Sequence, residues 1–161
     1  MIASRLTLAA MIAMTTLGSA SDQTPPAEGG GTSPTTIISA ADLTAAFAKS
    51  KSFLETPEYR ISTARREGPG DVEIHTVDTD IFYVIEGTAT LVTGGEMLES
   101  RQTGPHEFRG SSIKGGVTKT VGKGDMIIIP KNDPHWFKEV KAPFIYLVIK
   151  STSRSSVDLK G

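Results

Sequence analysis

The sequence has 161 residues, no cysteine, and 17 basic against 18 acidic side chains, which gives a formal net charge of −1. Without cysteine the chain has neither disulfides nor a thiolate metal site. A charge so close to zero gives no support for binding to nucleic acid or to an anionic membrane surface. These features therefore point away from disulfide scaffolds, thiolate metal sites and proteins that bind nucleic acid or membrane surfaces.

The first twenty residues have the features of a secretory signal peptide. Arg5 supplies a positive start, residues 6–17 are rich in apolar side chains, and a Gly-Ser-Ala cleavage pattern follows at 18–20. The apolar segment is too short to cross a bilayer, which takes about 20 residues. The sequence therefore predicts export to the periplasm or the medium. The mature chain would begin near Ser21 and have no membrane contact.

A linker and a short helix are predicted next. Residues 21–36 contain three prolines, a run of three glycines and no large apolar side chain, which is typical of a disordered, flexible linker. Ser39 followed by Asp42 resembles a capping box, the signal that starts a helix. The apolar residues that follow share one helical face, so a surface helix is predicted over 40–49.

From Tyr59 onward the pattern changes to short segments of strand type separated by turns. The expected strands are 59–66, 72–75, 81–85, 88–93, 126–129, 135–140 and 144–150. Gly115 and Gly116 meet the positive φ angles of a two-residue turn, which predicts a hairpin there. Residues 96–112 are expected to form a long polar loop, and 151–161 a flexible tail. Regular short strands without a second helix predict an all-β sandwich or barrel.

The stretch 124–136 has the clearest organisation in the sequence. Its apolar run 126–129 is typical of a buried strand, and Pro130 ends that strand because proline cannot donate to the sheet. The turn that follows contains Asn132, a residue that tolerates left-handed backbone geometry. The chain then re-enters a strand at His135, so this histidine is predicted to lie at the mouth of an apolar barrel.

Two segments resemble the sequence motifs of the cupin superfamily. Asp80 and the following Ile-Phe-Tyr-Val-Ile-Glu-Gly are similar to the end of the first cupin motif. Gly-Asp at 124–125, the apolar strand, Pro130 and His135 are similar to the second motif. The two segments occur in the order that the family has, and the resemblance extends over about residues 68–150.

The resemblance implies a specific fold and site. The fold would be a single-domain, cupin-type jelly-roll β-barrel over residues 37–150, with a short N-terminal helix. In cupins the first motif supplies two histidines and a glutamate, and the second supplies one histidine. All four converge on a divalent metal inside the barrel.

The first motif departs from the family pattern by one residue. When the Ile-Phe-Tyr-Val-Ile-Glu-Gly stretch is aligned, Asp80 takes the position of the glutamate, and the two histidine positions fall on either side of His75. Successive strand residues point to opposite faces, so this phase matters. One extra residue in the turn 76–79 would restore it and bring Glu73 and His75, which share a face, into the two histidine positions.

The predicted metal ligands are therefore Glu73, His75, Asp80 and His135. Two imidazoles and two carboxylates suit Mn, Fe, Ni or Zn. Asp78 is a competing carboxylate in the same turn. A metal held by two or three of these residues and water is an alternative to the full set, and so is a barrel without a metal.

Each predicted ligand also has an alternative interpretation. Val72 and Ile74 could form the inward face of their strand, which would leave His75 in solvent. His135 could be a packed histidine at the barrel rim, and Asp80 a turn residue.

Two classes of function remain open from the sequence. The chain is either a binding cupin, with a small-molecule ligand or a metal in its barrel, or a metal-dependent enzyme, an oxygenase or isomerase of small organic molecules. His106 is expected to be exposed in the loop 96–112, or alternatively to belong to a lid. The family resemblance also implies a homodimer, formed through edge strands or sheet packing.

Overall fold

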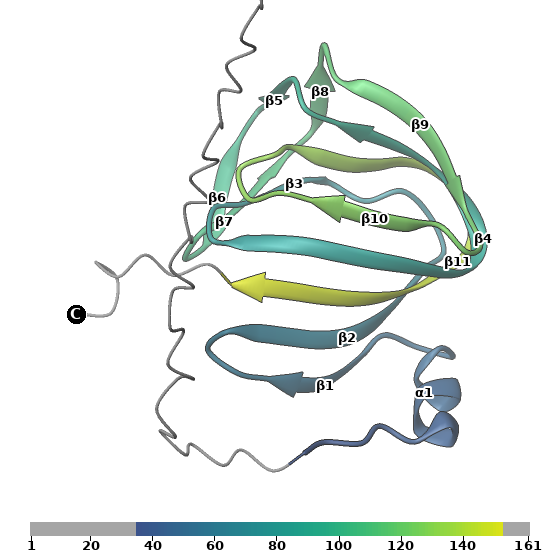
Figure 1. Ribbon diagram of the computed structural model, residues 1–161. Coiled ribbons are helices and arrows are strands. Elements are labelled where there is room, and N and C mark those ends of the chain that lie inside the picture. The colour runs from purple at the N-terminus through teal and green to yellow at the C-terminus, as the bar shows by residue number, and fades with distance from the viewer. Residues whose placement is uncertain (1–34, 153–161) are drawn as a thin grey trace, which may run out of the picture. The chain divides into compact units, whose positions relative to one another are not determined.

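The computed structural model describes residues 35–152. The predicted signal peptide, nearly all of the predicted linker and residues 153–161 lie outside this range. In chain order the described elements are α1 (Ala40–Ala46), β1 (Lys51–Glu55), β2 (Tyr59–Arg66), β3 (Val72–His75), β4 (Asp78–Thr93), β5 (Glu96–Leu98), β6 (Arg101–Gly104), β7 (Glu107–Gly110), β8 (Ser112–Lys114), β9 (Val117–Gly122), β10 (Met126–Ile129) and β11 (His135–Thr152). Within 35–152 one short helix accompanies the strands, so the predicted all-β class is confirmed (Figure 1).

The helix α1 begins at the predicted cap. The Ser39 hydroxyl accepts a hydrogen bond from the Asp42 N–H at 3.1 Å and donates one to the Asp42 carboxylate at 2.7 Å. The helix ends at Ala46, three residues before the predicted end, and a tight turn continues to Lys49. The Thr63 hydroxyl on β2 donates to the Ala46 carbonyl at 3.1 Å, which ties the helix end to the sheet.

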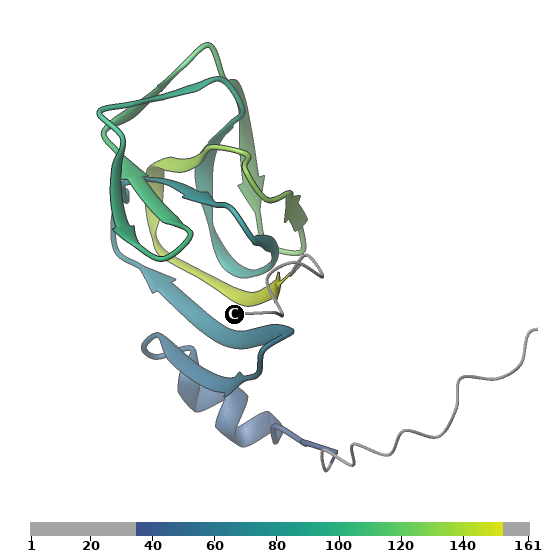
Figure 2. The same cartoon turned by 90° about the vertical axis from the view of Figure 1, so that its left-hand side faces the viewer.

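Strands β4 and β11 are the centre of the barrel. They pair antiparallel along their whole length, from His135 opposite Thr93 to Thr152 opposite Asp78. Neighbouring strands extend the sheet in the order β1-β2-β11-β3-β7-β6, while β4 also pairs with β9 and β10. The strands curl around a common interior in both ribbon views, which is the jelly-roll architecture expected from the sequence (Figures 1 and 2).

Both long strands were predicted as two shorter ones. Each strand bends but does not end. The bend of β4 at Gly87 lies against the bend of β11 at Pro143. Gly87 in β4 has φ +84°, and a Cβ atom there would lie 2.2 Å from the Pro143 carbonyl oxygen of β11, so only glycine fits. On β11 the β4–β11 register shifts at the same place, between Lys141 and Ile145. β11 also continues to Thr152, beyond the predicted end at Lys150.

The segment 96–112 differs most from its prediction. It is not a loop but holds the strands β5, β6, β7 and the start of β8. The predicted hairpin across Gly115 and Gly116 is also wrong, because β8 pairs with β5 whereas β9 pairs with β4. Gly115 does have a positive φ of +75°, and a Cβ on Gly116 would lie 2.8 Å from the Val92 side chain. The two glycines therefore connect β8, in the two-stranded sheet with β5, to β9 in the main sheet.

The barrel interior contains an apolar core dominated by aromatic rings. Phe137, Phe144 and Tyr146 of β11 lie 5.1–5.4 Å apart between ring centroids, and Phe82 of β4 packs 5.1 Å from Tyr146. The other buried members of this core are Val84, Ala89, Leu91, Val121, Ile129 and Val148. These side chains come mainly from β4 and β11, so the strand pair that organises the sheet also supplies the core.

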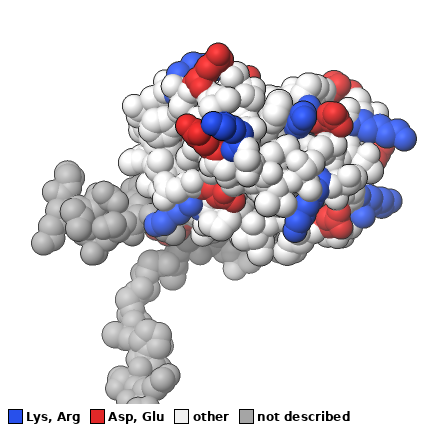
Figure 3. Space-filling view, turned by 90° about the horizontal axis from the view of Figure 1, so that it is seen from above, with Lys and Arg blue, Asp and Glu red and all other residues white. Residues whose placement is uncertain are grey.

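The outer surface carries charges of both signs. In Figure 3 acidic and basic side chains are interspersed over the visible face, in keeping with the near-neutral composition. No helix among residues 35–152 is long and apolar enough to cross a membrane.

Candidate metal centre

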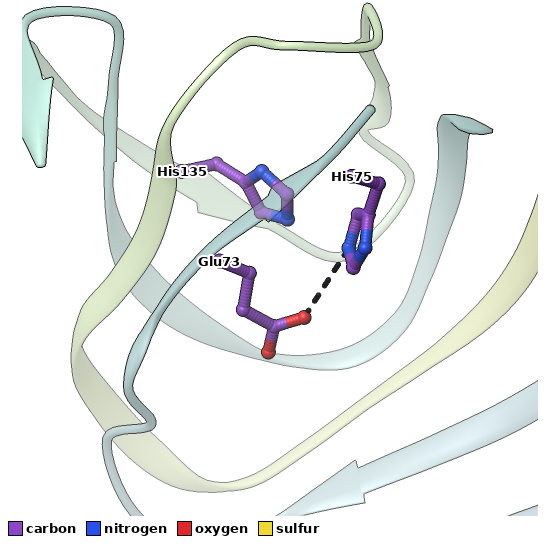
Figure 4. Close-up of side chains that lie close together, drawn as sticks. All are labelled: Glu73, His75 and His135. Atoms are coloured by element: carbon purple, nitrogen blue, oxygen red, sulfur yellow. Dashed lines mark ion pairs between the residues drawn. The ribbon is translucent and has the colours of Figure 1, made fainter. Parts of the chain in front are cut away.

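Strand β3 directs His75 into the barrel. The His75 side chain is 3% exposed and its ring faces the interior, so the alternative in which it points to solvent is wrong (Figure 4). The backbone around it is held from both sides. The Asn132 N–H donates to the His75 carbonyl at 2.8 Å, and the Thr76 N–H donates to the His106 carbonyl at 3.0 Å. Asn132 has the predicted left-handed geometry, with φ +67°.

The His75 ring is oriented by a carboxylate outside the predicted set. Its Nδ1 lies 2.7 Å from Oε2 of Glu107, on β7. A carboxylate accepts but does not donate, so Nδ1 carries the proton in the neutral ring and Nε2 has a free lone pair. Metal-ligating histidines commonly have this arrangement, with the second nitrogen bound to a carboxylate or a carbonyl.

His135 is oriented in the same way by its own turn. Its Nδ1 donates to the Asp133 carbonyl at 3.1 Å, which again leaves Nε2 without a proton. The side chain is almost fully buried, and its ring centroid is 5.3 Å from that of His75. Among the described residues, the Nε2 atoms of both rings are buried and lack a partner with hydrogen-bond geometry. Buried polar atoms are rarely left in this state, so the pair requires an explanation.

Glu73 completes a cluster with the two histidines. Its Oε1 pairs with Arg66 at 3.3 Å and also with Arg109. Its other oxygen, Oε2, lies 3.4 Å from Nε2 of His75. One ligand atom from each of Glu73, His75 and His135 falls within 4.8 Å of the others, close enough to hold one metal ion (Figure 4).

Asp80 lies beside this cluster and is held by a lysine. Its Oδ2 is 3.3 Å from Nε2 of His75 and 3.6 Å from Nε2 of His135. Lys150 donates to both Asp80 oxygens, at 2.7 and 2.9 Å. Asp80 is 2% exposed and lies inside β4, so the interpretation as a turn residue is wrong. Asp78, the competing carboxylate, is bound instead by Arg60 and by the Thr152 hydroxyl.

The surrounding charges shift the pKa values of the cluster in a consistent way. Burial would raise the pKa of Glu73, but the nearby His75 ring and the charge of Arg109 hold it far below its ordinary value. Burial would lower the pKa of His75, but the carboxylates of Asp80 and Glu73 raise it to about 9. The pKa of His135 is lowered, chiefly by burial. Without a metal, a proton on His75 Nε2 therefore supplies the positive charge that these carboxylates attract.

Several residues that shape the site were not predicted. Glu107 orients His75, Arg66 and Arg109 pair with Glu73, and Lys150 pairs with Asp80. Arg66 and Lys150 lie at the ends of predicted strands, and charged residues there are ordinarily exposed. The clearest signal for Glu107 was the length of 96–112, since long insertions are often functional.

Two residues near the site, His106 and Trp136, have local roles. His106 lies between β6 and β7 with φ +64°, and its Nδ1 is 3.0 Å from the Thr76 hydroxyl. It is exposed, as expected. The Trp136 indole N–H donates to the Gly70 carbonyl at 2.7 Å, which fixes the chain next to His135.

Comparison with known proteins identifies the family. The family model described as Cupin matches residues 32–160, most of the chain. The chain belongs to the cupin family. The superfamily resemblance inferred from the two motifs is thereby confirmed, and the fold agrees with it. The comparison with curated proteins gave no match.

Several solved structures are similar to this cupin at low identity. BH2720 from Bacillus halodurans has a TM-score of 0.54 at 16% identity, over 78% of this chain and 86% of that chain. KdgF from a Halomonas species has a TM-score of 0.46 at 15% identity, over 65% and 80%. Hydroquinone 1,2-dioxygenase from Sphingomonas sp. TTNP3, solved with 4-hydroxybenzoate bound, has a TM-score of 0.45 at 16% identity, over 62% and 63%.

Proposed function

We propose that this cupin binds one divalent metal ion through Glu73, His75 and His135. One observation carries the proposal: two buried imidazole Nε2 atoms face the same small space, and neither has a hydrogen-bond partner among the described residues. A bound cation would satisfy both lone pairs at once. It would also replace the proton that Nε2 of His75 carries when no metal is bound.

The donor set fits a transition metal. Two imidazoles and one carboxylate suit Mn, Fe, Ni or Zn, and a three-residue set leaves coordination positions open. The orienting contacts from Glu107 and the Asp133 carbonyl fix both rings before any metal arrives. Asp80 is close enough to become a fourth ligand, although Lys150 competes with a metal for its carboxylate.

We propose a binding role for the barrel, with a metal-dependent oxygenase or isomerase as the second candidate. The enzyme alternative is supported by the open positions of the three-residue set and by a cavity of about 180 Å³ beside it. When bound, the metal would supply Lewis acidity or oxygen activation to a small organic molecule. The protein residues would hold that molecule next to it and exclude water.

We also propose that the protein is exported to the periplasm or the medium. Support comes from the positive start, the apolar segment and the small-residue pattern of residues 1–20. N-terminal sequencing of the mature protein from the extracytoplasmic fraction should find a start near Ser21. An uncleaved N-terminus in the cytoplasm would contradict export.

Metal content tests the binding proposal directly. The protein is purified without chelators or an affinity tag that binds metals, and metal is measured by mass spectrometry before and after incubation with Mn²⁺, Fe²⁺, Ni²⁺ or Zn²⁺. We expect about one equivalent in the wild type, and about a tenth of that or less in His135→Ala. His106→Asn is the matched control, because it removes the exposed histidine and asparagine tolerates the left-handed backbone there.

The outcomes separate the site from a folding defect. Circular dichroism and urea unfolding establish that each variant is folded before its metal is counted. The proposal is wrong if wild-type protein takes up much less than one equivalent of every metal, or if His135→Ala and His106→Asn retain the same amount. Turnover of small phenols, keto acids and sugars by the loaded protein would favour the enzyme alternative.

A further inference from the structure

The cavity beside the candidate ligands combines aromatic walls with cationic side chains. Phe82, Phe137 and Tyr146 line it together with Arg66 and Lys150, and its volume is about 180 Å³. An engineered apolar cavity of about 150 Å³ is known to hold benzene. The space is therefore sufficient for a molecule about the size of one aromatic ring. Its wall offers apolar contact and positive charge, and it also carries the carboxylates of Glu73 and Asp80.

The carboxylates around the cavity are matched in number by Arg and Lys side chains, with His75 left out of the count, before any metal is added. Each carboxylate of the set lies within ion-pair distance of a cationic side chain; the carboxylates are Glu73, Asp78, Asp80 and Glu107, and their partners are Arg60, Arg66, Arg109 and Lys150. A divalent metal, which displaces the proton of His75, would leave two positive charges that no residue of this set neutralises. An uncompensated charge in a partly buried site is unfavourable, and an anionic ligand would remove part of it.

Arg66 has donors left to receive such an anion. Its Nε donates to the Tyr146 hydroxyl at 2.8 Å and one Nη donates to Glu73 at 3.3 Å. A guanidinium has five N–H donors, so these bonds do not exhaust it. Its position is fixed further by the Phe137 ring, whose centroid lies 5.1 Å away. The group is thus a pre-oriented donor in the cavity wall rather than a mobile surface side chain.

We propose that the metal-loaded cavity binds a small organic carboxylate, up to about the size of benzoate. The aromatic rings pack against its apolar part, while the metal and the cations of Arg66 and Lys150 counter its charge. This inference rests on the proposed metal site and adds the chemical class of the ligand. It distinguishes carboxylates from neutral molecules of the same shape, because only an anion relieves the excess positive charge.

A paired series of ligands provides the test. Acetate, butyrate and benzoate, and the neutral amides acetamide, butyramide and benzamide, are titrated calorimetrically into Zn²⁺-loaded protein whose metal content has been measured. We expect each carboxylate that fits to bind at least about tenfold more tightly than its amide, because charge-assisted hydrogen bonds are roughly twice as strong as neutral ones. Carboxylate affinity should fall by a similar factor in metal-free protein.

A charge variant separates ligand binding from general damage. Lys150→Gln removes one cation of the wall but keeps an N–H donor for Asp80. We expect carboxylate affinity to fall about tenfold while Zn²⁺ affinity stays the same or rises, because the removed charge attracts an anion and repels a metal. A purely structural defect would lower both affinities. Lys123→Gln, at an exposed lysine, is the matched control and should change neither.

Each result has a defined consequence. Protein that loads metal but binds carboxylates no more tightly than amides overturns the carboxylate proposal and leaves the metal site standing. Loss of both affinities in Lys150→Gln also overturns it. Protein that takes up no metal overturns the metal site and the carboxylate proposal together.

Discussion

The barrel interior has two regions with opposite chemistry. One is the aromatic core, in which Phe144 is fully buried among neighbouring rings. The other is the ionic cluster, in which Glu73, His75, Asp80 and His135 crowd together within the same barrel. Tyr146 joins the two regions, because its ring packs in the core and its hydroxyl accepts from Arg66.

The two regions affect stability differently. Burying a large apolar side chain contributes about 1.5–3 kcal/mol, so the aromatic core stabilises the fold by itself. A buried ion pair contributes little or nothing relative to apolar packing, because desolvation offsets the attraction. Its contribution to stability therefore does not explain the ionic cluster. This cluster, rather than the aromatic core, is the region that we expect to bind a ligand.

Truncation in the aromatic core should have the largest effect on folding. Phe144→Ala is expected to lower the free energy of unfolding by about 3–5 kcal/mol, through lost burial and the cavity it leaves. Urea unfolding measures this, with Tyr83→Ala as control because Tyr83 is 43% exposed. An effect no larger than that of Tyr83→Ala would show that the core does not carry the stability.

Metal binding should stabilise the fold through the ionic cluster. A metal present at about 1,000 times its dissociation constant is expected to add about 4 kcal/mol to the free energy of unfolding, because it binds only the folded state. Urea unfolding with and without metal measures the gain. It should persist in Tyr83→Ala and vanish in His135→Ala. An equal gain in His135→Ala would place the metal elsewhere.

Loss of the contact that orients His75 should weaken metal binding without removing it. Glu107→Gln keeps the shape but replaces a charged acceptor at Nδ1, and such changes commonly cost about 10–100-fold in metal affinity. Competition with a chromogenic chelator measures the affinity. Glu96→Gln, at an exposed position of the same segment, should leave it unchanged. Equal affinities for the two variants would contradict the orienting role.

The smallest expected change for a single step is the tenfold dependence on each pH unit that His75 sets. Its pKa of about 9 means that metal-free protein carries a proton at the ligand nitrogen at pH 7. A metal must displace this proton, so metal affinity should rise about tenfold for each pH unit between 7 and 9 and then level off. Chelator competition across this range, under conditions without metal hydroxide, tests it. A flat affinity from pH 7 to 8 would show that His75 is neutral or is not a ligand.

The predicted ligands illustrate how far local rules extend. Glu73 and His75 were expected to share a face because strand residues alternate, and both do reach the interior cluster. The turn before His135 was expected to tolerate Asn132 in left-handed geometry, and φ +67° agrees. Both predictions needed only the periodicity of a strand and the geometry of one residue. Which face of β3 was buried stayed open, because alternation defines two faces and does not choose between them.

Strand pairing was less accessible from the sequence. The run of glycines at 115–116 indicated a turn correctly, but the strands on either side pair with different partners, β8 with β5 and β9 with β4. Turn chemistry is local, whereas pairing depends on which distant strand lies alongside. The same limit made 96–112 look like a loop, since its strands are short and mostly polar.

By itself, the sequence determined the family, the all-β barrel, and the positions of four potential metal ligands in the two motif regions. These follow from residue spacing and turn chemistry over short distances along the chain. The tertiary structure alone decided that His75 points inward and which groups surround it. The contacts Arg66–Tyr146, Asp80–Lys150 and His75–Glu107 join residues 80, 70 and 32 positions apart. Such contacts exist only once the barrel brings the strands together, so no local pattern encodes the charge and orientation of the site.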